Sequence, residues 1–188
     1  MSEVRSNEQW AAGQPHESLV AIGDPRLNQP VHPLAEPTAH GGLFTRMISL
    51  LRELNGAGLA APQIGEPVAA IVIEIRRTNL FPDRPPSPLI AMANPELVDA
   101  SEEVVDDWEG CFSIPGLMGR VPRHRHIQVR YITPEGQQRE DKFSGYMARV
   151  IQHELDHLAA VTFIQRIPSM DTLTTVGNYL RFHQRPDS

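Results

Sequence analysis

Hydrophobic residues recur at helical spacing in two segments of the chain. Between residues 43 and 54 they fall on one face of a helix, as Leu43, Phe44, Met47, Ile48, Leu51 and Leu54. Asn55-Gly56 follows, a pair typical of a helix C-terminus. Residues 145–158 form the second segment, and Ser144 is suited to cap its first turn. We predict a helix in each segment, with only a weak indication of a third near residues 170–183.

Strand patterns occupy much of the remaining chain. VAAIVIEI, at residues 68–75, is an apolar run rich in β-branched residues. HIQVRYI, at residues 126–132, alternates polar and apolar positions. The turn sequence TPEG separates it from a further strand that ends near Phe143, which predicts a hairpin. Residues 88–105 are predicted to hold two short strands around Asn94-Pro95.

These elements predict an α+β fold in which antiparallel strands pack around the helix of residues 145–158. A chain of 188 residues is long enough for one ordinary domain with its own core. Residues 1–18 are polar and without pattern, so we expect a disordered N-terminal extension, with residues 19–188 as a single domain. The proline-rich stretch 25–37 is expected to run extended along the surface.

Composition narrows the class of protein. The net charge of −6 opposes general attraction to phosphate backbones, so no specific nucleic-acid partner is predicted. No apolar run approaches the roughly 20 residues of a membrane span, and the N-terminus lacks the apolar core of a signal peptide. The single cysteine, Cys111, excludes an internal disulfide. A cytoplasmic protein in a reducing compartment is therefore expected.

Residues 153–157 read HELDH, which matches the pattern H-E-x-x-H. On a helix, His153 and His157 stand on one face about 6 Å apart along the axis, so both imidazoles can bind one metal ion. Glu154 can then reach a water on that ion without being a ligand, which favours metal-assisted hydrolysis with a carboxylate base. Two solvated histidines are the alternative, but the apolar neighbours Ile151 and Leu155 favour a helix packed inside the protein.

Catalytic metal sites usually have three protein ligands, so a third is expected elsewhere in the chain. No glutamate follows Glu154, and Phe163 stands where one metalloprotease family has its third histidine. Asp171 and His183 remain conceivable ligands in weakly patterned sequence. Cys111, in DWEGCFSIPG, is flanked by Gly110 and has no continuous apolar run around it. We therefore favour Cys111 as a ligand over a buried structural cysteine.

Three segments together resemble the peptide deformylase family. GAGLAAPQIG (56–65) is similar to that family's G-x-G-L-A-A-x-Q, EGCFS (109–113) to its E-G-C-L-S, and QHELDH (152–157) to its Q-H-E-x-D-H. Weaker similarity extends from Asp24 to about Ile167. The resemblance implies the fold and the activity of that family, which is metal-dependent removal of the formyl group from N-formylmethionine at the N-terminus of nascent polypeptides, with release of formate.

The resemblance also implies catalytic roles, and residues 19–188 become a catalytic domain. The expected metal ligands are Cys111, His153 and His157. Glu154 is expected to act as general base, and Gln63 to stabilise the developing oxyanion together with the backbone N–H of Phe112. A Cys-His-His set suits zinc, whereas the resemblance implies one Fe²⁺ ion per chain, with Zn²⁺, Ni²⁺ or Co²⁺ as possible replacements on purification.

Further residues are expected to contact the substrate or support the site. Gly58 is expected to offer backbone contacts, because a residue without a side chain allows close approach. Ala57 and Val150 are expected in the wall of the methionine pocket. Glu109 and Arg123 are expected to form an ion pair that fixes the cysteine loop.

Two alternatives and two departures from the family pattern accompany this interpretation. A peptidase acting on ordinary peptide bonds is one alternative, and a catalytically silent relative that binds peptides or ribosomes is the other. A ribosome contact through the C-terminal segment is a further hypothesis.

Ala159 and Ala160 stand in HLAAVTF, where the family usually has H-L-x-G-x-L-F. If that glycine position has a positive φ, alanine there costs stability.

Overall fold

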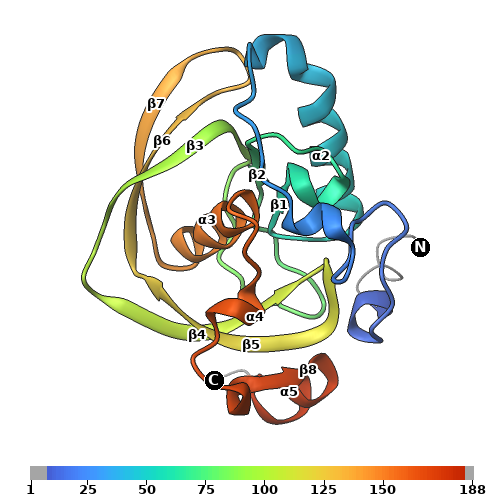
Figure 1. Cartoon of the computed structure of the whole chain (residues 1–188). Helices are drawn as coiled ribbons and strands as arrows, with labels where there is room; N and C mark the ends of the chain where they lie inside the picture. The colour runs from blue at the N-terminus through green and yellow to red at the C-terminus, as the bar shows by residue number, and fades with distance from the viewer. Residues whose placement is uncertain (1–7, 185–188) are drawn as a thin grey trace.

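The computed structural model describes residues 8–184, in which two antiparallel sheets surround a helix (Figure 1). The larger sheet has the strand order β1-β2-β3-β6-β7 and the smaller one β4-β5-β8. The strands are β1 Gly58–Ala60, β2 Ala70–Ile73, β3 Ile90–Ala100, β4 Val104–Cys111, β5 Ile114–His124, β6 His126–Ile132, β7 Gln138–Ser144 and β8 Leu173–Thr175. The predicted α+β fold is confirmed.

The α-helices are α2 Gly41–Glu53, α3 Gly145–Leu158, α4 Phe163–Arg166 and α5 Val176–Phe182, and the 3-10 turns are η1 Pro25–Asn28, η2 Pro37–His40, η3 Ala61–Ile64 and η4 Met170–Thr172. Within residues 8–184, no helix has both the length and the apolar character needed to cross a membrane. The two strongly predicted helices, α2 and α3, are confirmed.

Helix α3 is the predicted central helix. It contacts β1, β2, β6 and β7 of the larger sheet and β5 of the smaller one. Its buried residues run almost without interruption from Ala148 to His157. Ser144 has the extended backbone of an N-cap residue, as predicted, but its side chain makes no capping hydrogen bond. Packing from both sheets therefore holds this helix and the HELDH sequence it carries.

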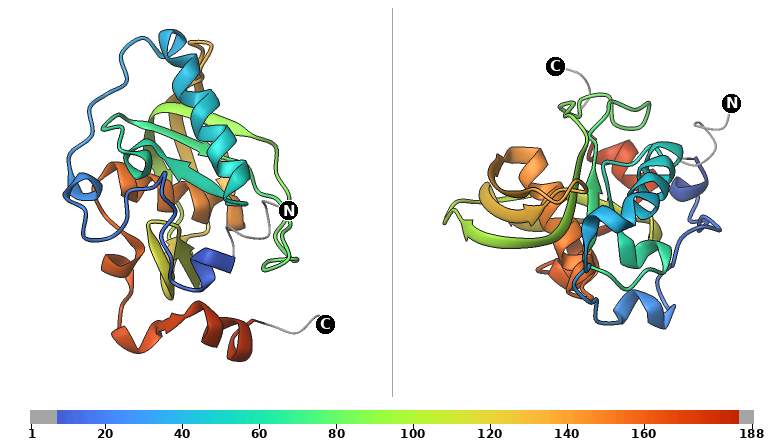
Figure 2. Two further views of the ribbon diagram at one scale, coloured as in Figure 1. Left: turned by 90° about the vertical axis from the view of Figure 1, so that its right-hand side faces the viewer. Right: turned by 90° about the horizontal axis from the view of Figure 1, so that it is seen from above.

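Strand β2 is buried on both faces, which accounts for its uninterrupted apolar sequence. Successive side chains of a strand point to opposite faces. Ala70 and Val72 accordingly pack in the core that includes α2, whereas Ile71 and Ile73 pack in the core that includes α3. Figure 2 shows α2 and α3 on opposite sides of this sheet.

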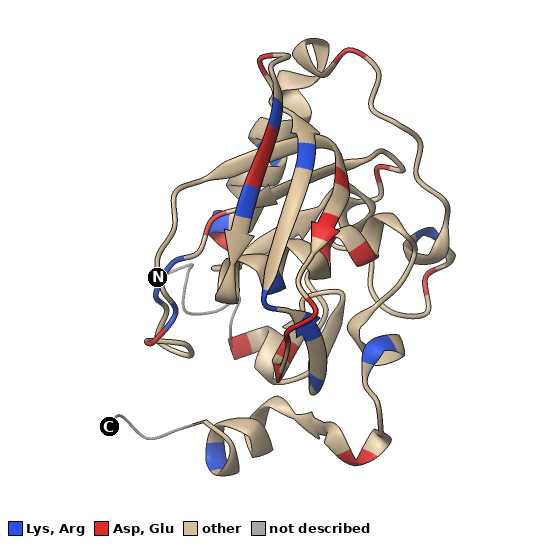
Figure 3. Ribbon diagram, turned by 90° about the vertical axis from the view of Figure 1, so that its left-hand side faces the viewer, with Lys and Arg blue, Asp and Glu red and all other residues tan. Residues whose placement is uncertain are grey.

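The predicted hairpin is β6–β7, with a register that runs from His126 opposite Ser144 to Ile132 opposite Gln138. Charged residues of both signs occur along its strands (Figure 3). Among them, Nε of Arg130 lies 2.9 Å from Oε2 of Glu140 across the pair. The charged face is exposed, while the alternate residues of β6 pack toward α3.

The two short strands predicted around Asn94-Pro95 are instead one strand, β3. A register shift between Ala93 and Glu96 interrupts its pairing with β6 at the proline, which has no N–H to donate to a ladder. Asn94 adopts a positive φ of 49° at this point. Its side chain accepts a hydrogen bond from the N–H of Leu34 and donates one to the Leu34 carbonyl. Tertiary contacts therefore stabilise the irregularity.

Three further expectations are corrected. The expected disorder of the N-terminal extension is wrong for residues 8–18, because residues 8–11 are helical and Trp10 is only 5% exposed. Residues 1–7 lie outside the described part of the chain. The stretch 25–37 is not simply extended, since it contains η1 and begins η2 and buries Leu27 and Leu34. The weakly indicated C-terminal helix begins only at Val176, because Leu173–Thr175 pair with β5.

Helix α3 ends in a hydrogen-bonded turn that places Ala160 at a φ of 57°. The N–H of Val161 donates to the Asp156 carbonyl (2.8 Å) and the N–H of Ala160 to the His157 carbonyl (3.2 Å). These two bonds define a Schellman motif, whose left-handed position is usually glycine. Ala160 therefore occupies a backbone conformation that is strained for a residue with a Cβ atom, as the departure from the family pattern suggested.

We expect Ala160→Gly to raise the free energy of unfolding by roughly 1 kcal/mol, because glycine adopts this conformation without steric cost. The matched control is Ala159→Gly, since Ala159 has an ordinary φ of −88°. That change is expected to be neutral or destabilising by up to about 1 kcal/mol. Urea unfolding of both variants measures the difference. An Ala160→Gly variant no more stable than the parent would contradict the assigned strain.

Candidate metal and catalytic site

Cys111, His153 and His157 come together in the core. One ligand atom from each lies within 4.8 Å of the others, and all three side chains are buried. Sγ of Cys111 is 3.2 Å from Nε2 of His157. The sequence interpretation named these same three residues, and in the described part of the chain they form the candidate metal cluster.

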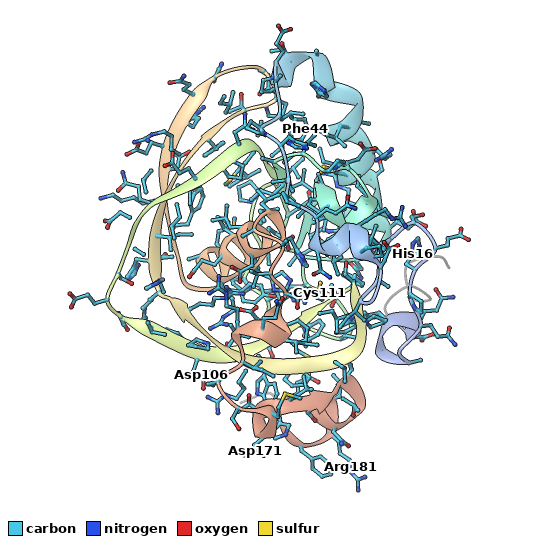
Figure 4. All side chains as sticks on the ribbon, in the orientation of Figure 1. His16, Phe44, Asp106, Cys111, Asp171 and Arg181 are labelled. Carbon is cyan, nitrogen blue, oxygen red and sulfur yellow. The ribbon has the colours of Figure 1, made fainter. Side chains whose placement is uncertain are left out.

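The cysteine reaches the helix because of a turn between two long strands. Cys111 is the last residue of β4, and it pairs with Ile114, the first residue of β5. Phe112 and Ser113 form the turn between them. His153 and His157 lie on the face of α3 that meets this turn. Figure 4 shows Cys111 near the centre of the molecule, whereas Asp171 lies in the peripheral C-terminal segment.

The electrostatic surroundings favour the thiolate form of Cys111. Burial alone would raise the pKa of the thiol, but His157 and hydrogen bonds to the two imidazoles lower the pKa of Cys111 to about 5. The thiolate is the form that binds metal ions. A thiolate and two imidazoles are also the donor types that suit zinc and other first-row transition metals.

A buried ion network holds the ring of His153. Nδ1 of His153 donates to Oε2 of Glu109 over 2.9 Å, which leaves Nε2 free to be the ligand atom. Arg123 binds the same carboxylate through Nε (2.8 Å) and Nη2 (2.9 Å), so the predicted Glu109–Arg123 ion pair is present. Burial would raise the pKa of Glu109, but hydrogen bonds from Arg123 and His153 outweigh it and hold that pKa well below its ordinary value.

Arg149 and Asp156 extend this network, and the sequence interpretation missed both. Nη1 of Arg149 donates to Oε1 of Glu109 (2.7 Å), and Nη1 of Arg123 to Oδ2 of Asp156 (2.6 Å). Both side chains are buried. Arg149, His153 and Asp156 have the spacing i, i+4, i+7, which places them on one face of a helix. This spacing is the feature of the sequence from which a charged helix face that includes His153 could have been predicted.

Glu154 is buried beside the cluster and is unusually basic. Burial raises the pKa of Glu154 to about 7, although the nearby imidazoles partly oppose that increase. Within residues 8–184, its Oε2 atom has no hydrogen-bond partner. A Cβ atom added at Gly58 would lie 2.5 Å from Oε1 of Glu154 and 2.8 Å from Cγ1 of Val150. Only glycine therefore fits at Gly58 with the carboxylate in this position.

Gln63 faces the cysteine turn from η3. Its Oε1 atom accepts a hydrogen bond from the N–H of Ala60 over 2.8 Å, which fixes the orientation of the amide group. Its Nε2 atom then points to Sγ of Cys111 (3.4 Å) and Oγ of Ser113 (3.2 Å). The result is a buried N–H donor held beside the candidate ligands.

A cleft of about 760 Å³ opens onto these groups. Its lining includes all of the residues expected to contact substrate, namely Ala57, Gly58 and Val150, together with Gln63, Phe112, His153 and Glu154. The rest of the wall is aromatic in part, with Trp10, Phe81, Trp108 and Tyr179. His183 also lines the cleft, but it is not part of the ligand cluster. Its ring lies against that of Trp108, with the two ring centroids 4.7 Å apart and the ring planes tilted by 36°.

The residues present fit a bound divalent metal ion. The donor set is a thiolate-prone cysteine and two imidazoles whose ligand atoms converge. The buried Oε2 of Glu154 lacks a protein partner, which suits a group that interacts with a molecule in the cleft. An α+β fold with this ligand set and an adjacent buried carboxylate defines the class of metal-dependent hydrolases.

Comparison with known proteins identifies the family. The polypeptide deformylase family model matches residues 16–172. Peptide deformylase 1 of Bordetella pertussis is 39% identical over 153 residues, which cover 80% of this chain and 86% of that protein. Peptide deformylase 2 of a Nostoc species is 35% identical over 160 residues, which cover 83% of this chain and 89% of that protein.

Solved structures agree with this comparison. A class I type b peptide deformylase from Acinetobacter baumannii superposes with a TM-score of 0.77 at 32% identity, covering 80% of this chain and 97% of that one. Peptide deformylase from Thermotoga maritima has a TM-score of 0.71 at 32% identity, with the same two coverages. The chain belongs to the polypeptide deformylase family.

Proposed function

We propose that this chain is an active deformylase that hydrolyses the formamide of N-formylmethionine at the N-terminus of nascent polypeptides and releases formate. The observation that carries the proposal is the convergence of Cys111, His153 and His157 beside the buried carboxylate of Glu154, at a cleft that Cys111, His153 and Glu154 line. A silent relative would be expected to lack a ligand or the base, and this chain retains both. Ordinary peptidase activity has no support among the relatives, which are named as deformylases.

In this proposal Cys111, His153 and His157 hold one divalent metal ion. When bound, the ion lowers the pKa of a water molecule and polarises the formyl carbonyl. Glu109 orients His153 through its Nδ1 hydrogen bond and so supports the ligand geometry. We propose Fe²⁺ as the ion in the cell, as the family resemblance implies. Metal analysis of protein purified without oxygen tests this, and zinc in such a preparation would contradict it.

The proposed role of Glu154 is proton transfer. Its carboxylate takes a proton from the attacking water and later gives it to the amine that leaves. A general base works best when its pKa is near the working pH, and burial raises the pKa of Glu154 to about 7. Gly58 leaves the space in which this carboxylate lies.

Gln63 and the backbone N–H of Phe112 are proposed to stabilise the oxyanion. Negative charge develops on the formyl oxygen as water attacks, and fixed N–H donors stabilise that charge. The Gln63 amide is already oriented by its bond from Ala60. Phe112 replaces the leucine of the family pattern, but the proposed contact is made by its backbone. Ala57 and Val150 are proposed to contact the methionine side chain, and Gly58 the peptide backbone of the substrate.

The test of the proposed function is formate release from formyl-Met-Ala-Ser by protein whose metal content has been measured. We expect release that depends on the metal and is abolished by a chelator. Unformylated Met-Ala-Ser is the control for ordinary peptide-bond cleavage. A parent enzyme fully loaded with metal that releases no formate would contradict the proposal.

The raised pKa of Glu154 predicts a pH dependence. The base must be a carboxylate, so kcat/KM is expected to fall about tenfold per pH unit below its pKa. For the metal-free protein that pKa is about 7, above its ordinary value of 4.5, and a bound cation favours the carboxylate and lowers it. The decrease of kcat/KM toward low pH, which is the acid limb of the profile, is therefore expected to begin at or below about pH 7. Initial rates between pH 4 and 9 measure it, and an acid limb clearly above pH 7 would be inconsistent with this assignment.

The cellular setting is also proposed. Nascent polypeptides are made in the cytoplasm, so we propose a cytoplasmic enzyme, with residues 19–188 as its catalytic domain. A ribosome contact near the site where the nascent chain emerges is proposed for the C-terminal segment, where Arg181 and His183 are exposed. Arg185, also considered for this contact, lies outside the described residues. Ribosome co-sedimentation that is unchanged by Arg181→Glu would argue against the contact.

A further inference from the structure

The helical turn at residues 8–11 packs against the turn that joins β4 and β5. Trp10 of this helical turn contacts Cys111 and Phe112 of the other turn. A Cβ atom added at Gly116 would lie 2.8 Å from Cα of Gly13, which shows how closely the backbones approach. The family match begins only at residue 16, so this N-terminal segment is outside it. Its side chains are therefore not covered by the roles that the family pattern assigns.

Trp10 contacts three consecutive residues of the cysteine turn. Its Nε1–H donates a hydrogen bond to the Cys111 carbonyl over 2.8 Å. The indole ring lies against Gly110, where an added Cβ atom would be 2.7 Å from Cζ2 of Trp10. The centroids of the Trp10 and Phe112 rings are 5.6 Å apart. Trp10 is only 5% exposed, so these contacts are made in the interior.

The hydrogen bond from Trp10 acts on a particular peptide unit. The carbonyl of Cys111 and the N–H of Phe112 belong to the same planar peptide group, in which they point in opposite directions. A donor that holds this carbonyl therefore also fixes the direction of the Phe112 N–H. Hydrogen bonding to a carbonyl further polarises the amide and makes its N–H a stronger donor.

We propose that Trp10 is a positioning residue for the oxyanion site. Its indole N–H holds the Cys111 carbonyl so that the Phe112 N–H points toward the formyl oxygen in the transition state. This inference rests on the proposed role of the Phe112 N–H in formamide hydrolysis. The N-terminal segment thus contributes to the reaction through the Cys111–Phe112 peptide group, in addition to lining the cleft.

The test compares Trp10→Phe with Gln9→Ala in the full chain. Phenylalanine keeps an aromatic ring next to Phe112 but lacks the N–H donor and the outer ring atoms Cζ2 and Cη2 that lie against Gly110. Gln9 is exposed on the same helical turn. We expect Trp10→Phe to lower kcat by about tenfold, part of the 100-fold or greater loss typical of a missing oxyanion donor. Metal content is expected to remain unchanged, and KM to change less than kcat, because Trp10 also lines the cleft. The carbonyl ¹³C signal of Cys111 in the zinc-loaded protein is expected to shift in Trp10→Phe but not in Gln9→Ala.

Several results would overturn the inference. An unchanged kcat in Trp10→Phe, with the carbonyl signal shifted, would show that the hydrogen bond does not affect catalysis. Loss of metal in step with activity would show that Trp10 supports the Cys111 ligand and not the N–H. In both cases the parent remains an active deformylase, so the proposed function stands. A parent that releases no formate overturns the proposed function and this role together.

Trp10→Ala provides a second measurement. It removes the ring contacts as well as the N–H, so we expect a kcat no higher than that of Trp10→Phe, together with a lower melting temperature. If the alanine variant does not fold, the phenylalanine variant still decides the question. Equal kcat values in the two folded variants, both below the parent, would assign the whole effect to the hydrogen bond, as proposed.

Discussion

Replacing Glu154 with glutamine is expected to lower kcat for formate release by about 10³- to 10⁴-fold, toward the upper end for loss of a general base. Glutamine retains the size of the side chain, which is enclosed between Gly58 and the candidate ligands. It cannot accept a proton from water at neutral pH. Cys111, His153 and His157 are unchanged, so metal content is expected to equal that of the parent. Steady-state assays and metal analysis on the same preparation measure both quantities.

The same substitution should leave stability intact. In the metal-free protein, burial raises the pKa of Glu154 above its unfolded value, so the ionised carboxylate costs stability at any pH above about 4.5. The neutral amide avoids that cost, and the metal-free variant is expected to melt at or above the temperature of the metal-free parent at pH 8. Glu140→Gln, a charge-matched change on the exposed face of β7, is the control for kcat. A Glu154→Gln enzyme with near-parental kcat would contradict the assigned role.

Replacing Gln63 with leucine is expected to lower kcat by about 10²- to 10³-fold, the typical effect of removing one oxyanion donor. The Nε2 group lies beside Cys111 and is held in a buried position, so its N–H is oriented before the reaction begins. The donor strengthens its interaction as charge develops on the formyl oxygen. KM is therefore expected to change much less than kcat, because ground-state binding is little affected.

Leucine at this position also removes a structural hydrogen bond, since Oε1 of Gln63 accepts from the N–H of Ala60. Gln165→Leu is the matched control, because Oε1 of Gln165 accepts from the N–H of Thr162 over 2.7 Å with the same three-residue spacing. The Gln165→Leu substitution removes an equivalent hydrogen bond from a backbone N–H, at a position that does not line the cleft. Both variants are expected to lose stability, but only Gln63→Leu is expected to lose kcat. Similar kcat values in the two variants would refute an oxyanion role for Gln63.

The helices and the hairpin were predictable from local patterns. The apolar spacing of α2 predicted the helix and Asn55-Gly56 predicted its end, where Asn55 has a positive φ of 57° in the structure. The alternation in β6 and the turn sequence TPEG predicted the hairpin with β7, and the structure supplies its register. Strand β3 was predicted as two pieces because proline usually interrupts a ladder. The local sequence does not reveal that the Leu34 backbone forms two hydrogen bonds with the Asn94 side chain, which stabilise the irregular part of β3.

The candidate ligands were also available from the sequence. His153 and His157 have a fixed relationship on any helix, because the spacing of four residues puts them on one face. Cys111 is distant from these two histidines in the sequence, and it was identified as a candidate ligand from its local composition and from the family pattern. Long-range partners were harder to find. Arg149 and Asp156 look like ordinary charged positions until the sheets bury them against Glu109 and Arg123.

The sequence by itself therefore determined the family and identified the candidate ligands and the proposed base, because these depend on residue identity and on short, fixed spacings. Only the tertiary structure decided which groups surround them. Burial raises the pKa of Glu154, since a charged carboxylate loses its hydration when α3 is enclosed by two sheets. The position of Trp10 on the cysteine turn likewise depends on contacts between residues about 100 positions apart. No local pattern specifies such contacts, because they form only when the whole chain packs.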